Sequence, residues 1–515
     1  MSHPESLGAS HERETRPSAL TARQAEDTSL RALWLLILVG TTLRLLFAAS
    51  LGLGVDESYV VAAGRTIRFG YFDHPPAVWW LSSLTAQLAG SAAPVIVRLP
   101  FILLFALSTW LVYRLGAHLF SPRAGLWAAV TLNLSPLFGI AFGTFVLPDG
   151  PLDAFLLAAA LFLAFALEAL GSAAFVWWLL AGLALGLALF SKYSAILVLA
   201  GAFLYLCASP RHRGWLARPA PWLAVLVAFL VFSPVLLWNF HHHWISFAYQ
   251  GGRAGSFALH PLAPFIVFGG EALFLLPWIW LPLVLSGVGA LRSGPGAWRG
   301  WLLLCLGLPA ILLFSIVALG SRGRVLFHWA APGYLMLFPL LGDAIERRLA
   351  AGDRAIRPWL LFTAGFVLIG AALVGADARF NLLAPFVSPG HDPALQIIDW
   401  GSLGPELARR HLLDRPGLVI GTVRWSDAAK IDYALGGSPP VIVLGADPHE
   451  YGLIHPLARY RGHDVLIIAP NVAPARIVAD YGKLFSRIET LPPLTIEHDG
   501  VPASTAPFYL GRRLR

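Results

Sequence analysis

The sequence predicts an all-α polytopic membrane protein of about eleven transmembrane helices, followed by a small C-terminal α/β domain. Of its 515 residues, 57% are hydrophobic and 13% charged, and the mean hydropathy is +0.67. A soluble globular protein has roughly 25% charged residues. The composition therefore excludes an ordinary soluble enzyme, a disordered chain and a protein that binds nucleic acid through an exposed basic surface.

Long apolar segments give the number of helices. A bilayer core of about 30 Å requires about 20 apolar residues per helix. Eleven stretches meet this requirement, some of them marginally: 31–52, 94–114, 124–142, 151–169, 174–190, 193–208, 220–239, 263–290, 300–319, 329–345 and 358–376. A further apolar stretch, 76–90, is short and follows two prolines, which predicts a helix lying on the membrane surface.

The distribution of basic residues predicts the orientation. Residues 1–30 are polar and mixed in charge, and we interpret them as a disordered cytoplasmic tail. They do not show the order of charged, apolar and cleavage regions that is typical of a signal peptide, so the first apolar segment is expected to be an uncleaved anchor. With this tail inside, the cytoplasmic loops contain fifteen basic residues and the opposite loops seven, as the positive-inside rule requires. Eleven crossings of a bacterial inner membrane then place the C-terminal region in the periplasm.

The composition changes after about residue 376. Polar residues and turn signals appear, and short β-rich runs occur at 418–421, 441–444 and 465–469. Helical stretches are predicted between them, near 393–413 and 426–435. Alternation of strands and helices is typical of a small α/β domain. The predicted division is a tail (1–30), a transmembrane catalytic domain (31–376) and a periplasmic domain (377–515).

Acidic residues gather in the loops of the predicted external face. Asp56 and Glu57 follow the first apolar segment, and Asp149 and Asp153 stand four apart at the start of the fourth, where they can share a helix face. Helix capping and complementarity to the helix dipole are the structural alternatives for both pairs. Two acidic clusters in separate loops of one membrane face favour a functional site.

Basic residues also occur in the loops of this face, where the positive-inside rule does not favour them. Their presence there suggests a role other than setting the orientation. The guanidinium group matches phosphate oxygens in a bidentate geometry; the alternative is ion pairing with external acidic residues. A carboxylate base beside such cations suits glycosyl transfer from a lipid-phosphate sugar, because the base removes the proton of the acceptor hydroxyl and the cations stabilise the departing phosphate. The candidate donor-phosphate ligands are Lys192, Arg253, Arg322, Arg324 and His328.

No cofactor is assigned from the sequence. Residues 241–243 are consecutive histidines, which point in different directions on a helix and seldom bind one metal ion together. An interfacial role beside Trp244 is the preferred interpretation, and a divalent metal remains an open alternative. The glycine-rich segment 251–255 lacks the strand–helix context of a nucleotide-binding loop, which disfavours a nucleotide-sugar donor.

Two motifs resemble those of a known family. The first is Asp56-Glu57-Ser58-Tyr59, followed by Gly70-Tyr71-Phe72-Asp73-His74-Pro75-Pro76, and the second is Pro148-Asp149-Gly150-Pro151-Leu152. They look like the external loops of the protein mannosyltransferase-like (family 39 type) membrane glycosyltransferases, which include bacterial aminoarabinose and galacturonic acid transferases of lipid A. Weaker matches occur at 191–193, 238–247 and 250–253, so that the resemblance spans most of residues 31–345.

The resemblance implies a GT-C fold, an external active site, a polyprenyl-phosphate-linked sugar donor and inversion at the anomeric carbon. It implies that Asp56 is the catalytic base, that Asp149 positions the substrate and that Lys192 lies near the donor phosphate. A lysine that follows the first motif in the aminoarabinose enzymes has no clear match here, which argues against that sugar. The predicted substrate-binding residues are Glu57, Asp73, His74, Asp149 and Asp153.

Two other classes of protein fit parts of the sequence. A lipid or saccharide transporter, such as a flippase, would explain the helices, but it predicts internal repeats and charges at mid-membrane depth, which the sequence does not show. A membrane scaffold that displays the α/β domain would leave the acidic clusters unexplained. The predicted partners are the donor, membrane lipids and an envelope acceptor, which can be lipid A, another glycolipid, a polysaccharide or a protein; nucleic acid is not among them.

Overall fold

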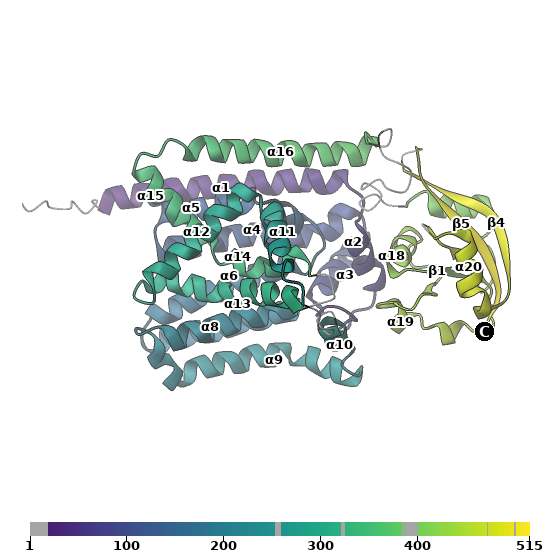
Figure 1. Ribbon diagram of the computed structural model, residues 1–515, viewed down its shortest axis with the longest axis horizontal. Helices are drawn as coiled ribbons and strands as arrows, with labels where there is room; N and C mark the ends of the chain where they lie inside the picture. Colours follow the sequence, from purple (N-terminus) through teal and green to yellow (C-terminus); the bar gives the residue numbers. More distant parts are fainter. Residues whose placement is uncertain are drawn as a thin grey trace, which may run out of the picture.

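The computed structural model describes residues 19–252, 259–320, 325–383, 386, 400–470, 472–498 and 501–515. Long helices form a bundle, and a domain built on a β-sheet lies at one end of it (Figure 1). The fold class predicted from the sequence is confirmed.

The eleven predicted segments coincide with helical parts of the bundle. Seven of the described helices are long and apolar enough to cross a membrane, or nine if each of two bent pairs is one span. Segment 193–208 is shorter, and segment 329–345 is divided, so the number eleven stays a prediction. The bundle elements are α1 (Ala19–Ser50), α4 (Pro94–Leu119), α5 (Pro122–Leu134), η1 (Pro136–Phe142), α6 (Asp149–Glu168), α7 (Gly171–Ser191), η2 (Tyr193–Ala195), α8 (Ile196–Ala208), η3 (Arg213–Ala217), α9 (Pro219–His241), α11 (Ala263–Leu275), α12 (Pro277–Ser293), α13 (Trp298–Gly320), η4 (Phe327–Ala330), α14 (Ala331–Leu335), α15 (Phe338–Ala350) and α16 (Ile356–Phe380).

Helix α1 begins before the membrane segment. Residues 1–18 lie outside the described residues, but residues 19–30 are helical and continue into the first span. The predicted disordered tail therefore extends too far towards the C-terminus. Alanine, leucine, arginine, glutamine and glutamate dominate this stretch, and they have high intrinsic helix propensity.

A half-buried arginine binds one of the two bent spans. The bends are 66° between α5 and η1, where Pro136 begins the second half, and 113° between α11 and α12. In the first, Arg44 of α1 donates from Nε to the Gly139 carbonyl (2.7 Å) and from Nη2 to Asn133 Oδ1 (2.9 Å). Proline removes a helical hydrogen bond, and a charge inside a membrane requires polar partners. Arg44 therefore donates to acceptors of the broken helix, and these acceptors give its charge polar partners. Gly139 lies ten residues before Asp149.

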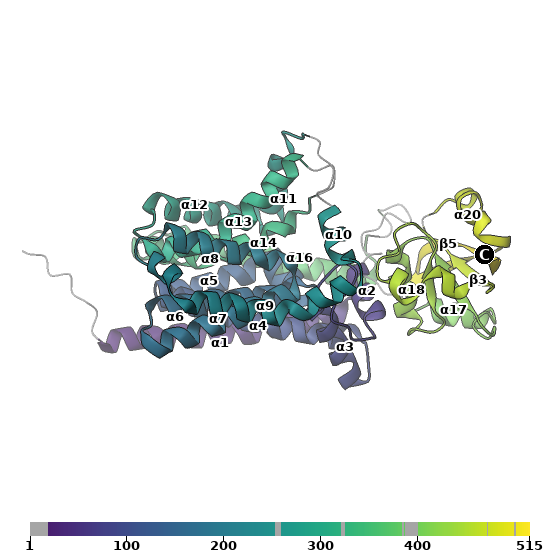
Figure 2. The same ribbon diagram turned by 90° about the horizontal axis from the view of Figure 1, so that it is seen from below.

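Three short helices lie at the end of the bundle that faces the sheet domain (Figures 1 and 2). They are α2 (Val55–Ala63), α3 (Ala77–Ala89) and α10 (Ile245–Gly252). Helix α3 matches the helix predicted at 76–90. The first turn of α1 lies at the opposite end of the bundle (Figure 1).

The C-terminal domain contains a five-stranded sheet in the order β2-β1-β3-β5-β4. Strands β2, β1 and β3 are parallel, and β5 and β4 extend the sheet in antiparallel pairing. The first three strands were predicted, but the β4–β5 hairpin was not. The predicted boundary at residue 377 falls in the last turn of α16. The elements are α17 (Leu403–Arg409), β1 (Val419–Thr422), α18 (Trp425–Ala434), β2 (Val441–Val443), α19 (Tyr451–Ile454), η6 (Leu457–Tyr460), β3 (Val465–Ile468), α20 (Pro474–Tyr481), η7 (Gly482–Leu484), β4 (Phe485–His498) and β5 (Val501–Leu514).

The topology leads to a first testable prediction. Reporter fusions placed after Arg213 and after Arg461 should report opposite sides of the membrane, cytoplasmic and periplasmic respectively, because positively charged loops are retained in the cytoplasm. Paired alkaline phosphatase and green fluorescent protein fusions measure this directly. A cytoplasmic signal from both positions would show that the chain crosses the membrane an even number of times between Arg213 and Arg461, against the prediction.

Candidate functional site

Helix α2 presents the first acidic pair in two different environments. Asp56 is exposed, whereas Glu57 is buried, with 3% of its surface accessible. Glu57 Oε2 accepts a hydrogen bond from the Gly54 backbone N–H (2.8 Å), three residues earlier. This is one half of a capping box and satisfies an amide at the helix start. Because the cap fixes the first turn, Asp56 projects from a rigid element.

A buried ion pair attaches this turn to the bundle. Arg98 of α4 donates to Glu57 from Nε (2.8 Å) and from Nη2 (2.6 Å), and the Val146 amide donates to Glu57 Oε1 (3.0 Å). Arg98 also donates to three carbonyl groups at the end of α1, those of Ala48, Leu51 and Gly52. Both Glu57 oxygens are therefore engaged by protein groups. This arrangement differs from the predicted contact between Glu57 and substrate, and it gives Glu57 the geometry of a positioning residue.

The second acidic motif is paired with a lysine. Asp149 begins α6 and Lys192 follows α7; Lys192 Nζ lies 2.7 and 2.9 Å from the two Asp149 oxygens. The carboxylate is buried, and 12% of the lysine side chain is accessible. No side-chain bond caps α6, so the capping alternative for Asp149 is not observed. An ammonium group has three N–H donors, and two contacts with Asp149 leave the third for a ligand.

Asp153 lies one turn farther along α6. It is 2% accessible, and neither of its carboxylate oxygens has a hydrogen-bond partner among the described residues. The hydroxyl group of Ser194, two residues after Lys192, is also buried and also has no hydrogen-bond partner among the described residues. Buried polar groups nearly always have partners, so this region is suited to a polar ligand or to water.

The predicted residues Asp73 and His74 lie half-buried in the loop between α2 and α3. Helix α10 holds this loop, since Gln250 Nε2 donates to the Asp73 carbonyl (2.5 Å). The charge of Asp73 is close enough to interact with Tyr193, the neighbour of Lys192. Three loops that are distant in the sequence therefore converge at one end of the bundle.

The remaining predicted cations are only partly described. Arg253, Arg322 and Arg324 lie outside the described residues. His328 is half-buried in η4, and its ring meets that of Phe142 edge to face at 6.5 Å. Within the described ranges, no group of three or more histidine, cysteine, aspartate or glutamate side chains could hold a metal ion.

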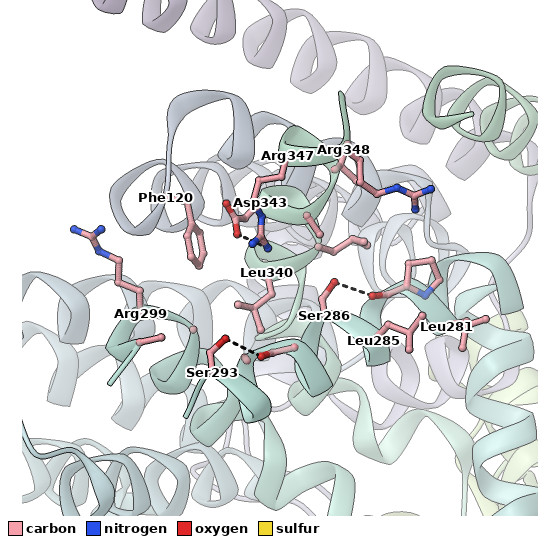
Figure 3. Close-up of a pocket in the computed structure, with 18 of the residues that line it drawn as sticks. Phe120, Leu281, Leu285, Ser286, Ser293, Arg299, Leu340, Asp343, Arg347 and Arg348 are labelled. Carbon is pink, nitrogen blue, oxygen red and sulfur yellow. Dashed lines mark hydrogen bonds and ion pairs between the residues drawn. The ribbon is translucent and has the colours of Figure 1, made fainter. Parts of the chain in front are cut away.

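A large cavity lies elsewhere in the bundle. It measures about 1040 Å³ and is lined by parts of α12, α13, α15 and α16 (Figure 3). None of the predicted site residues lines it. We therefore do not assign the donor phosphate to this cavity.

Sequence reasoning missed several residues that shape the site. Arg98 is one of the seven basic residues that the sequence analysis counted in the loops opposite the cytoplasm, although an arginine inside an apolar helix is itself a signal of a buried partner. Residues of the C-terminal domain were not expected at the site at all. Those that contact the loops and short helices at this end of the bundle are Lys430, Asp432, Tyr433, His449 and Glu450.

Comparison with known proteins shows which family part of the chain is similar to. Residues 73–238 match the family described as dolichyl-phosphate-mannose-protein mannosyltransferase. The fold is similar to that of ArnT from Cupriavidus metallidurans, solved with bound undecaprenyl phosphate, with a TM-score of 0.65 and 16% identity over 92% of this chain and 97% of ArnT. The chain has the GT-C fold. The resemblance predicted from its two acidic motifs is thereby confirmed.

Two curated relatives are similar to part of the chain. The lipid A galacturonosyltransferase RgtD of Rhizobium johnstonii is 26% identical over 293 residues, which cover 55% of this chain and 58% of RgtD. The undecaprenyl phosphate-alpha-4-amino-4-deoxy-L-arabinose arabinosyl transferase of Pectobacterium carotovorum is 28% identical over 345 residues, which cover 62% of this chain and 58% of the relative. The matched region therefore spans less than two thirds of each of these relatives.

Proposed function

We propose that this GT-C protein transfers a sugar from a polyprenyl-phosphate-linked donor to an envelope acceptor, with inversion, at the periplasmic face of the bacterial inner membrane. The supporting observation is the pair of the buried Asp149 and the half-buried Lys192 beside the helix that presents Asp56. Glu57 connects the two, because it follows Asp56 and binds the amide of Val146, three residues before Asp149. One end of the bundle thus holds both the exposed carboxylate of Asp56 and the ammonium group of Lys192.

The proposed reaction uses these groups in sequence. The Asp56 carboxylate accepts the proton of the acceptor hydroxyl, and the hydroxyl oxygen attacks the anomeric carbon from the face opposite the phosphate. The bond between the anomeric carbon and the phosphate oxygen breaks, and polyprenyl phosphate leaves with its electron pair. Lys192 stabilises the charge that develops on the leaving phosphate.

Other predicted residues have supporting roles in this proposal. Asp149 orients Lys192 and the substrate, while Asp73, His74 and Asp153 contact the sugar or the acceptor. His328 and the three arginines outside the described residues complete the phosphate site. The relatives act on lipid A or use an undecaprenyl phosphate sugar by name, which supports a lipid donor and a glycolipid acceptor.

A transfer assay tests this function. Purified protein in detergent is supplied with undecaprenyl phosphate carrying radiolabelled galacturonic acid or aminoarabinose, together with lipid A. Label should move to the acceptor, and undecaprenyl phosphate should be released in equal amount. If neither sugar is released from its phosphate with any envelope acceptor tested, including other glycolipids, polysaccharide and protein, the proposed activity is wrong.

Removing Lys192 tests the phosphate site. Lys192→Ala should weaken donor binding about ten- to hundredfold, because a hydrogen bond to a charged group contributes about 1.5–3 kcal/mol. Titration of the labelled donor measures this. Lys483→Ala, in η7 of the C-terminal domain, is the matched control and should bind normally. Wild-type donor affinity in a variant with alanine at positions 192, 253, 322 and 324 would contradict the assignment.

A further inference from the structure

We propose that the C-terminal domain is part of the active site, and that Glu450 is a positioning residue that holds the loop presenting Asp73 and His74. This inference rests on the proposed function, because that function gives the loop its importance. The site predicted from sequence contained residues of the membrane bundle alone.

Both carboxylate oxygens of Glu450 bind this loop. Arg68 Nη1 donates to Oε1 (2.7 Å), and the backbone amide of Phe72, the neighbour of Asp73, donates to Oε2 (2.8 Å). The Glu450 side chain is fully buried. Its backbone amide donates to the hydroxyl group of Tyr59 (3.1 Å), three residues after Asp56. One residue of the C-terminal domain therefore contacts both acidic elements of the first external loop.

The preceding residue is held in a strained conformation. His449 has a φ of 49°, in the left-handed region that residues with a side chain seldom adopt. Its ring stacks on Trp425 at 4.4 Å and contacts Phe72 at 5.1 Å, and its Nε2 lies 3.0 Å from the Tyr249 hydroxyl. Strained residues persist where their surroundings determine the conformation, and they are frequent at functional sites. Here the strain directs His449 and Glu450 to the same loop.

Helix α10 holds the loop from another element. His243 and Trp244 also have positive φ values, 55° and 57°, in the turn that leads into α10. The helix then places Ser246 and Gln250 against the carbonyl groups of residues 71 and 73. Since α10 binds carbonyl groups and Glu450 binds an amide and a guanidinium, the two contacts are complementary. Neither can replace the other.

The burial of Glu450 makes its partners necessary. Burial raises the pKa of this carboxyl group, the hydrogen bond from the Phe72 amide and the charge of Arg68 lower it, and the charge of Asp73 raises it. A carboxylate without these partners would be unfavourable in this place. The domain is also attached independently: Lys430 donates to the Leu53 carbonyl (2.5 Å), and Asp432 pairs with Arg65 (2.7 Å). The Glu450 contact can therefore be changed while the domain stays in place.

A substitution of similar shape isolates the positioning role. Glu450→Gln replaces one acceptor with an NH₂ group, which faces either the Phe72 amide or Arg68. We expect kcat to fall about a hundredfold, because a displacement of about 1 Å at a reacting group can cost that much, with KM for undecaprenyl phosphate galacturonic acid changed less than threefold. Hydrogen exchange of residues 66–76 should become faster. Glu489→Gln, on the β4 strand of the same domain, is the control and should leave kcat and exchange unchanged.

Two single substitutions of Arg68 keep the inference testable if Glu450→Gln is poorly folded. Arg68→Lys retains the charge and should lose less activity than Arg68→Gln. Where Glu450→Gln is folded, adding Arg68→Gln to it should be no worse than Glu450→Gln alone. Wild-type kcat and unchanged loop exchange in folded Glu450→Gln would overturn the inference. Hydrogen exchange is measured without turnover, so it separates the two proposals. If loop exchange is faster in Glu450→Gln but the wild-type protein transfers no sugar, the proposed function is overturned and the contact between Glu450 and the loop is retained.

Discussion

Replacing Asp56 with asparagine should lower turnover by about 10²–10⁴-fold, the usual contribution of general-base catalysis. The substitution keeps the shape of the side chain and removes its basicity. Because Asp56 is exposed in the first turn of α2 and the cap is formed by Glu57, the helix should remain intact and donor binding should survive. Single-turnover sugar transfer and donor titration measure the two effects separately.

The same assays distinguish Asp56 from Asp149. Asp149→Asn should cost less in turnover and more in apparent donor affinity, since it releases Lys192 from its partner. Asp414→Asn, at an exposed position of the C-terminal domain, should have wild-type activity. If Asp56→Asn turns over within a few-fold of wild type and Asp149→Asn is inactive, the two roles are reversed.

Breaking the pair between Arg98 and Glu57 should have the largest effect on stability. Arg98→Gln leaves a buried carboxylate without its counter-ion, and such changes typically cost about 3–5 kcal/mol. The variant should also lose activity, because Glu57 fixes the turn of Asp56 and the chain before Asp149. Thermal unfolding in detergent compares it with Arg347→Gln, which breaks a pair whose arginine is exposed and should cost about 1 kcal/mol or less.

A double variant tests why this pair matters. Arg98→Met with Glu57→Met removes both charges and should recover much of the lost stability, since replacing a buried ion pair with apolar groups is often neutral. Activity should stay low, because the amides of Gly54 and Val146 lose their acceptor. Stability near wild type in Arg98→Gln alone would show that the buried pair is not what holds this turn.

Hydropathy predicted the membrane segments well because burial in a bilayer acts on about 20 residues at a time. It could not predict the bends. The segment 263–290 appears continuous in composition, yet Leu276 has a φ of 71° and the chain turns by 113°. Pro277, which begins α12, was the local sign of this break.

The sequence predicted candidate site residues one at a time, whereas the contacts among them come from the structure. The spacing of Asp149 and Asp153 indicated a shared helix face. It did not indicate that Asp149 alone pairs with Lys192, because the position of Lys192 depends on where α7 ends. Likewise, nothing in the residues around Glu450 indicates that they bind a loop almost 400 residues earlier. Such contacts depend on the docking of the whole C-terminal domain, and local patterns do not encode it.

The hairpin of β4 and β5 shows another limit of pattern reasoning. Its strands contain Pro492, Pro493 and Pro502, residues that normally argue against a strand. The register shifts between Leu491 and Leu494, and this irregularity accommodates two of the prolines. The pairing with β3 that stabilises this hairpin is a tertiary contact.

The most direct measurement follows the donor itself in sealed vesicles that contain the purified protein. Undecaprenyl phosphate galacturonic acid, labelled in the sugar, is placed in the leaflet on the side of the C-terminal domain together with lipid A. The wild-type protein should cleave the bond between sugar and phosphate and transfer the label to lipid A, whereas Asp56→Asn should leave the donor intact. Movement of the intact donor to the opposite leaflet, without cleavage and at equal rates in both proteins, would contradict the account and identify a transporter.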